Sequence, residues 1–473
     1  MTAIAPTRAD AYQLVHEGAL ALAQAERYGV RIDVDYCSKK KKHLERQTSR
    51  LHKKILKEPE VQLWKKKYRS KFNINSDEQL GDILYNDLGY KPAKITSKSQ
   101  GTDNEKGSTD HEALVGIDLP FIKMYMKGKK LKKGWDVING IQREQVNGLI
   151  HPNYTLHFTD TFRSSCRDPN LQNVPIRDDF LQKIARTAFI PRKGRRLLEI
   201  DYGGIEVHGA SWYHKDPVML NYLNDSSTDM HRDVSADCYK LNDYLTDKEY
   251  WKKKEGYGKD VRYAGKNKYT FPQFYGSYYA ECARNLWNAI DELHLKDPSG
   301  HLLKKHLKQQ GIGTYKKFES HIKNVEDDFW NRRFQVYGQW KEDWYEQYLK
   351  KGYMDTLTGF RISGVLRKNQ IINYPVQGVA FQCLLWSFKE LTKIAINNGW
   401  KSRPIMQIHD SIIWDVHPYE LNMVLHACYD VMIVKLKETW DFIITPIEIE
   451  ADLTGIDRPW NEKKTIELFD FIN

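Results

Sequence analysis

Two aspartates lie inside largely apolar, strand-like segments, where their carboxylates could bind metal ions. Asp201 occurs in RLLEIDY at residues 196–202, and Asp410 occurs in IMQIHDSIIWDV at residues 405–416. A carboxylate in such a segment costs free energy unless something pairs with it. Hard oxygen ligands on rigid strands suit Mg²⁺, and two such ions about 4 Å apart stabilise the attacking and leaving oxygens of phosphoryl transfer. The alternative is that each aspartate simply ends a strand or begins a turn.

The elements that would position these aspartates differ along the chain. Residues 11–148 read as long polar helices, with apolar residues at helical spacing such as Leu44, Leu51 and Ile55. After residue 151, short apolar runs are bounded by turn signals and are separated by helical stretches at 229–349 and 378–397. The pattern predicts a helical arm followed by strands and further helices.

Composition indicates a globular protein with an anionic partner. The 473 residues are 41% hydrophobic, enough to form two or three packed regions, and carry a formal net charge of +11. Excess positive charge favours polyanions, because binding releases their counterions. Lysines crowd residues 39–42, 65–67 and 127–133. Such runs can also be solvated helix faces, so the charge alone does not establish nucleic-acid binding.

Cysteine spacing and hydropathy exclude several other classes. The six cysteines lie far apart without a C-x-x-C pair, which argues against a zinc module and against a disulfide framework. No run of eighteen apolar residues occurs, and the N-terminus lacks the pattern of a secretory signal. We therefore expect a soluble protein of the cytoplasm without a membrane partner.

Five segments carry motifs whose order matters as much as their content. They are TFRSSCRDPNLQNVPIR at 161–177, DYGGIE at 201–206, RYAGKNKYTFPQFYG at 262–276, NYPVQG at 373–378 and QIHDS at 407–411. With residues 21–34 and 73–88, which resemble the base and helices of a thumb, these segments resemble family A DNA polymerases, the family of bacterial DNA polymerase I. The resemblance covers nearly the whole chain, although Cys166 replaces a usual serine.

The resemblance implies a role for each matching residue. Asp201, Asp410 and the backbone carbonyl of Tyr202 would bind two Mg²⁺ ions, or Mn²⁺ in their place, and the two aspartates would be catalytic. Glu206 would be a steric gate that fills the space of a ribose 2′-hydroxyl and so selects dNTPs. The further dNTP-binding residues would be His231, Arg262, Lys266, Phe271 and Tyr275. The primer-template-binding residues would be Arg163, Asn170, Gln172, Asn373, Gln377 and His409.

Residues 262–276 depart from the family pattern by one residue. Counting forward from Arg262 puts Thr270 at the aromatic position, whereas counting back from Tyr275 puts Phe271 there and Asn267 at the lysine position. We favour Lys266 together with Phe271, and keep Lys268 as a substitute for the lysine. An inserted residue, with Pro272 marking a local bulge, would explain the mismatch.

The segment QIHDS lacks the acid that usually follows its aspartate, because Ser411 stands there. We expect activity to remain, with metal affinity and rate in question. Asp415 could supply a compensating charge only if a bulge turned it to the same face as Asp410.

The resemblance implies an α+β, right-hand polymerase fold with an antiparallel palm sheet. We expect an N-terminal segment with the base of palm and thumb at 1–39, a thumb at 40–150, palm at 151–220, fingers at 221–340 and palm again at 341–473. Only about twenty residues precede the first matching segment, so we expect no proofreading exonuclease in the chain. Expected partners are primer-template DNA, dNTPs and separate exonuclease, clamp or helicase proteins, in a bacterial or phage-infected cell.

Two other functions compete with a DNA polymerase. A catalytically weak or silent DNA-binding accessory subunit could keep the hand shape, and Ser411 and the altered segment 262–276 favour it. Retention of Asp201 and Asp410 argues against it, and primer extension would separate the two. Single-subunit phage RNA polymerases share the palm chemistry, but Glu206 and the PNLQN sequence favour deoxynucleotides.

Overall fold

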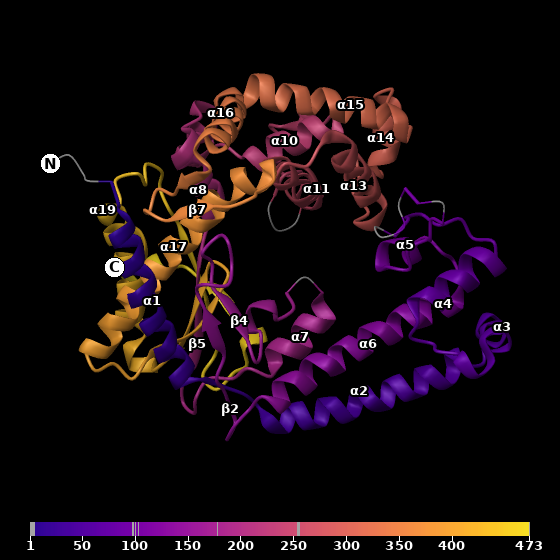
Figure 1. Ribbon diagram of the computed structural model, residues 1–473, viewed down its shortest axis with the longest axis horizontal. Coiled ribbons are helices and arrows are strands. Elements are labelled where there is room, and N and C mark those ends of the chain that lie inside the picture. Colours follow the sequence, from indigo (N-terminus) through magenta and orange to yellow (C-terminus); the bar gives the residue numbers. More distant parts are fainter. Residues whose placement is uncertain are drawn as a thin grey trace.

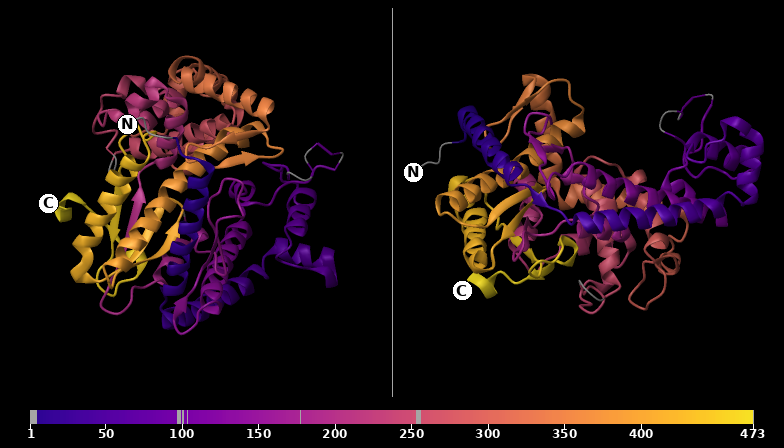
Figure 2. Two further views of the ribbon diagram at one scale, coloured as in Figure 1. Left: turned by 60° about the vertical axis from the view of Figure 1, so that its left-hand side comes forward. Right: turned by 90° about the horizontal axis from the view of Figure 1, so that it is seen from below.

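In the computed structural model, the chain forms a body that carries two helical arms (Figure 1). The structure describes residues 5–96, 99, 101–102, 104–176, 178–252 and 256–472. Arg177, the last residue of the predicted primer-template segment, lies outside the described residues. Seen from below, the lower arm reaches far out from the body (Figure 2). The expected combination of helical arms with an antiparallel sheet is confirmed.

The body contains a five-stranded antiparallel sheet that brings distant parts of the chain together. Its strand order is β11-β10-β5-β9-β8. In the central pairing, Asp201 lies opposite Ser411. The strands are β5 (Arg196–Tyr202), β8 (Arg403–Ile408), β9 (Ser411–Val416), β10 (Ile449–Leu453) and β11 (Lys464–Ile466).

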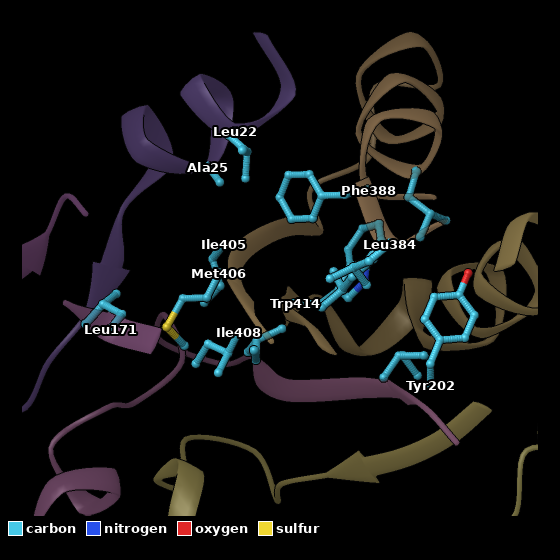
Figure 3. Packing of buried hydrophobic residues seen from close by; sticks show 14 of the residues in the cluster. Leu22, Ala25, Leu171, Tyr202, Leu384, Phe388, Ile405, Met406, Ile408 and Trp414 are labelled. Atoms are coloured by element: carbon cyan, nitrogen blue, oxygen red, sulfur yellow. The ribbon is translucent and has the colours of Figure 1, made fainter. Parts of the chain in front are cut away.

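Helices α1 (Arg8–Tyr28) and α17 (Lys368–Asn397) pack against each other and against β8. Gly18 permits this approach, because a Cβ atom there would lie 2.7 Å from Leu385. Every residue of β9 is buried, which explains why this strand reads as an apolar run in the sequence. Figure 3 shows the resulting core, with side chains from both helices and both strands: Leu22, Ala25, Leu384, Phe388, Ile405, Met406, Ile408 and Trp414.

The lower arm consists of two long helices that lie side by side, α2 (Val34–Ile55) and α6 (Pro120–Arg143), and of a small tip. Trp64 and Phe121, both fully buried, belong to a separate core in this arm. The tip elements are α3 (Pro59–Tyr68), η1 (Arg69–Lys71), α4 (Asp77–Gly81), η2 (Asp82–Asp87) and α5 (His111–Val115).

The upper arm has an aromatic core of its own. The rings of Phe329 and Phe334 lie 4.8 Å apart, and those of Phe274 and Tyr337 lie 5.5 Å apart. Its elements, with α8 at the junction to the body, are α8 (Ile205–His214), α9 (Pro217–Asn224), α10 (Met230–Tyr239), η4 (Asn242–Tyr244), α11 (Gly258–Gly265), η5 (Lys266–Thr270), α12 (Phe271–Phe274), α13 (Tyr279–Glu292), α14 (Leu303–Gln309), α15 (Tyr315–Asp328), η6 (Phe329–Arg333) and α16 (Gln335–Lys351).

Short elements complete the fold. Three two-stranded sheets pair β1 with β2, β3 with β4 and β6 with β7. Within the described ranges, no helix is both long and apolar enough to cross a membrane. The remaining elements are β1 (Val30–Arg31), β2 (Leu149–Ile150), β3 (Asn153–Thr155), β4 (Ser165–Arg167), η3 (Leu171–Asn173), α7 (Asp179–Thr187), β6 (Tyr353–Asp355), β7 (Arg361–Ser363), η7 (Pro418–Glu420), α18 (Leu421–Tyr429), η8 (Asp430–Lys435), α19 (Leu436–Thr439), η9 (Trp460–Glu462) and α20 (Phe469–Ile472).

Close packing of α11 on α10 makes Gly265 a sensitive position. A Cβ atom at Gly265 would lie 1.9 Å from Ser235 Oγ and 3.0 Å from Ser235 Cα, so the two helices would have to separate. We expect Gly265→Ala to destabilise the protein by about 1–3 kcal/mol in urea unfolding. The control is Gly140→Ala in α6, where nothing lies within 4 Å and helix propensity predicts a gain of up to about 1 kcal/mol. A Gly265→Ala protein as stable as the unaltered chain would contradict this packing.

Candidate active site

The sheet places the two aspartates next to each other. Asp201 lies near the end of β5, and Asp410 lies in the tight turn between β8 and β9. The backbone N–H of Tyr202 donates to the carbonyl oxygen of Asp410 at 3.2 Å, which ties the strand end to the turn. His409, the other turn residue, has a positive φ of 49°. This backbone geometry fixes the Asp410 side chain beside Asp201.

The electrostatics of this pair fit a divalent cation. Burial and then the charge of Asp410 raise the pKa of Asp201 to about 7, although the Asp201 side chain keeps an exposed edge in the site. Burial and then Glu206 raise the pKa of Asp410 to about 6, while Arg163 lowers it. Two crowded carboxylates that are costly to ionise together would gain from a shared cation. Yet the described residues include no group of three or more His, Cys, Asp and Glu side chains that forms a ready metal site.

Glu206 lies in the first turn of α8 and holds two other candidate residues. Arg163 Nη2 and the hydroxyl of Tyr275 both donate to its carboxylate. Arg163 also donates through Nε to the backbone carbonyl of Gln377 at 3.3 Å. Asn373 Nδ2 donates to the carbonyl oxygen of Tyr275 at 3.0 Å. Five of the predicted residues therefore form one connected network beside Asp410.

The predicted dNTP residues of the upper arm also lie together. Arg262 Nε donates to Asp229 Oδ2 at 2.7 Å, and Lys266 Nζ lies 5.2 Å from the centroid of the Phe271 ring. Phe271 stacks on Tyr275 with ring centroids 6.1 Å apart. Two cations and a stacked aromatic pair thus lie close together, a combination suited to a nucleoside triphosphate.

The expected bulge in residues 262–276 is present. The α-helix of α11 changes at Lys266–Thr270 to the π-helical turn η5, which ends two residues before Pro272. Because a π-helical turn accommodates one extra residue, Lys266 and Phe271 can face the same site. Thr270 is fully buried and cannot stack on a ligand, and Asn267 donates to the carbonyl of Tyr263 at 2.9 Å. The geometry favours the register that pairs Lys266 with Phe271.

His231 lies between these cations and the aromatic pair. Its ring centroid is 5.6 Å from that of Phe271, and its Nδ1 atom is buried without a hydrogen-bond partner among the described residues. Burial, Lys266 and Arg262 lower the pKa of His231 to about 3. The ring is therefore neutral near pH 7, and the neighbouring positive charges show that this pocket would favour an anion.

Two of the predicted primer-template residues, Gln172 and Asn170, differ in their surroundings. Gln172 Nε2 donates to Ser164 Oγ at 2.8 Å and to Gln407 Oε1 at 2.9 Å, and Gln407 Nε2 donates to the carbonyl oxygen of His409 at 2.7 Å. Gln172 thus helps to hold the turn that carries Asp410. Asn170 instead lies exposed before η3 and makes no side-chain hydrogen bond to another described residue.

Asp415 does not compensate for Ser411, because the bulge that this would require is not present in the β5–β9 pairing. Asp415 is buried opposite Leu197, toward the far end of the β5–β9 pairing from Asp201. Its Oδ2 lies 2.9 Å from Arg192 Nη1 and 3.8 Å from Arg195 Nη1, so its charge is already paired. The residue pairing of β5 with β9 is continuous and contains no bulge that would turn Asp415 toward the site.

Sequence reasoning missed one acidic residue of the site, Glu450. Strand β10 pairs with the free side of β5, and Glu450 lies directly opposite Asp201. The alternation of acidic and apolar residues in IEIEADL at 447–453 is the signal that could have indicated this strand. The alternation could not have shown which residue of β5 Glu450 faces.

The comparisons with known proteins agree on one family. Residues 35–263, just under half of the chain, match the model of DNA polymerase family A. Thermostable DNA polymerase I of Thermus filiformis is 26% identical over 463 residues, which cover 94% of this chain and 47% of that protein. DNA polymerase I of Synechocystis sp. is 34% identical over 215 residues, covering 44% of this chain and 20% of that one.

A solved structure and a phage protein extend this agreement. The POL domain of Pol1 from M. smegmatis, solved with DNA primer-template and dNTP, matches with a TM-score of 0.70 at 19% identity, covering 94% of this chain and 70% of that one. The DNA polymerase of Bacillus phage SP01 is 25% identical over 394 residues, which cover 76% of this chain and 37% of that protein. The chain spans about half or less of the length of these curated relatives. The family indicated by the sequence motifs is also the one on which the comparisons agree: the chain resembles DNA polymerase family A.

Proposed function

We propose that this chain is a template-directed DNA polymerase that adds dNTPs to a primer 3′-hydroxyl, using two divalent cations, Mg²⁺ or Mn²⁺. The observation that carries the proposal is the juxtaposition of Asp201 and Asp410, tied by the Tyr202–Asp410 backbone hydrogen bond. Lys266 and Phe271 of the upper arm lie together, and Lys266 is close enough to the sheet for Glu450 to affect its pKa. A silent accessory subunit would have no need to bury two carboxylates in one site, where burial, helped by neighbouring acids, raises the pKa of each.

The arms supply the parts of a hand. We assign the lower arm within residues 40–150 to the thumb, the upper arm within 221–340 to the fingers, and the sheet-bearing body to the palm. The duplex would lie against the lower arm, with the primer end at His409 and the template base near Tyr275. The fold shared with a POL domain that was solved with primer-template DNA and dNTP supports this arrangement.

The residues of the chain then have separate tasks. Arg262 and Lys266 bind the triphosphate, Phe271 stacks on the incoming base, and Glu206 occupies the space next to the sugar. Arg163 and Gln377 face the minor groove, whose acceptor pattern is common to all base pairs. The cations, when bound by Asp201, Asp410 and the Tyr202 carbonyl, would supply an activated 3′-hydroxyl and charge neutralisation at the departing pyrophosphate.

Loss of either aspartate tests the catalytic assignment. Asp201→Asn and Asp410→Asn each remove a cation-binding charge, so we expect primer extension to slow by about 10³-fold or more. Primer-template affinity should change little, because neither aspartate contacts the duplex away from the primer end. Extension by either variant at close to the unaltered rate, measured on purified protein, would show that the two-cation assignment is wrong.

The choice between dNTPs and rNTPs tests the proposed role of Glu206 as a steric gate. Glu206→Ala should incorporate rNTPs far better, because it opens the space for a 2′-hydroxyl, while dNTP use falls moderately as Arg163 and Tyr275 lose their shared partner. Glu206→Gln is the matched control, since it keeps the side-chain volume and should keep most of the discrimination. Single-nucleotide incorporation measures both substrates. Unchanged discrimination in Glu206→Ala would remove Glu206 from this role.

A lysine-lined cleft of about 830 Å³ in the lower arm is the surface on which we expect the duplex to bind. Lys127 and Lys133 of α6 line it and form no ion pair within the described ranges, whereas Lys130, also in the lining, is 2.7 Å from Asp178. Each phosphate contact adds about 0.9 to the negative slope of log affinity against log salt. Replacing Lys127 and Lys133 by glutamine should therefore flatten that slope by about two units. Lys132→Gln is the control, because Lys132 pairs with Asp136 and lies outside the cleft. An unchanged slope in the double variant would place the duplex elsewhere.

A further inference from the structure

One face of the palm sheet carries two opposed pairs of acidic residues. In the β5–β10 pairing, Asp201 lies opposite Glu450, and Glu199 lies opposite Asp452. Residues directly opposite each other on antiparallel strands project from the same face with Cβ atoms about 4.5–5.5 Å apart. Because side chains alternate along a strand, both pairs also share one face. Like charges in this arrangement repel unless a cation lies between them.

The two pairs differ in how their charge is balanced. Lys463 Nζ lies 2.5 Å from Glu199 Oε2 and 2.8 Å from Asp452 Oδ2, and Trp460 Nε1 donates to Glu199 at 2.7 Å. Glu450, in contrast, makes no ion pair or side-chain hydrogen bond with any other described residue, and it is exposed. Lys463 therefore contacts both members of the pair that lies farther from Asp410. Neither Asp201 nor Glu450 forms an ion pair with a described residue, although the charge of Lys463 still lowers the pKa of Asp201.

The charge of Glu450 acts on both sides of the proposed dNTP site. It adds to the increase in the pKa of Asp201, after burial, Asp410 and Glu199. It also opposes the lowering of the pKa of Lys266, which burial and then Arg262 cause. Glu450 is therefore close enough to influence the palm aspartate and the triphosphate-binding lysine of the upper arm.

We propose that Glu450 provides the third negative charge of the catalytic cation site, in place of the acid that Ser411 replaces. This inference rests on the proposed polymerase function. Ser411 cannot provide the charge, since it is buried and its hydroxyl donates to the Ile408 carbonyl at 2.9 Å. Glu450 is not placed as a direct ligand, because the described residues include no group of three His, Cys, Asp or Glu side chains that could hold a metal ion. It acts as a positioning residue through Asp201, whose hold on a cation its charge strengthens.

Direct cation binding tests the role of Glu450. Mn²⁺ is titrated into the full chain bound to a primer-template with a dideoxy-terminated primer, and free Mn²⁺ is followed by electron paramagnetic resonance. Glu450→Gln, which keeps the shape of the side chain, should weaken Mn²⁺ binding about tenfold. Glu450→Asp should retain most of the affinity because it retains the charge. Asp452→Asn is the matched control on the same strand and face, and should bind Mn²⁺ as the unaltered chain does.

Thermal unfolding without divalent cations gives a second readout. Glu450→Gln removes a repulsion with Asp201, so its Tm should equal or exceed that of the unaltered chain, whereas Mn²⁺ should raise its Tm less. Unchanged Mn²⁺ affinity in Glu450→Gln, or an equal loss in Asp452→Asn, would overturn the proposal.

The Asp201→Asn variant separates the two levels of inference. If Asp201→Asn loses Mn²⁺ binding and primer extension while Glu450→Gln loses neither, only the role of Glu450 is wrong. If Asp201→Asn keeps both, the two-cation function itself is wrong, and the role of Glu450 falls with it.

Discussion

The pairing of β5 with the β8–β9 hairpin is the constraint on which the site depends. It brings Asp201 and Asp410 together from distant parts of the chain, and the Tyr202–Asp410 backbone hydrogen bond fixes their separation. The carboxylates repel each other and lose water, so this arrangement is unfavourable by itself. Apolar packing of β8 and β9 against α1 and α17 offsets that cost, because these strands are almost entirely buried. The rigidity of the palm core thus serves to hold like charges close.

Opposite charges lie on separate elements that meet at the site. The palm sheet contributes carboxylates, whereas the upper arm contributes Arg262 and Lys266. In the proposed function, a triphosphate with bound cations would complement both sides, with its anionic oxygens toward the upper arm and the cations toward the sheet. The Glu206 network joins the two parts, because Glu206 extends from α8 while Tyr275 follows α12. The sheet-bearing body and the upper arm are therefore joined at the site through few residues.

Local sequence patterns could predict most residues of the site but only part of how the fold arranges them relative to one another. Aspartates in apolar strands indicated Asp201 and Asp410, and the mismatch in residues 262–276 indicated the bulge that η5 forms. Pairing between distant strands has no local signal, so the position of Glu450 opposite Asp201 could not be predicted. For the same reason, the sequence left open whether a bulge turned Asp415 toward the site, and it could not show that Arg192 and Arg195 pair with this residue. Gln172 was predicted to bind DNA, and its hydrogen bonds to Ser164 and Gln407 show a structural task that no motif reveals.

Ser411 stands where the family pattern has an acid, and the proposed role of Glu450 would keep that charge at the site from another strand. The serine hydroxyl donates to the Ile408 carbonyl and so closes the turn that holds Asp410, a task that a buried carboxylate could not perform without a donor of its own. A neighbouring strand can replace the charge, because antiparallel pairing sets which side chains share a face irrespective of their order in the sequence. Strand β10 satisfies that condition, with Glu450 on one side of Asp201 where Ser411 lies on the other. The acidic side chains beside Asp410 thus come from β5 and β10, so the acids of residues 407–411 alone underestimate the charge of this sheet face.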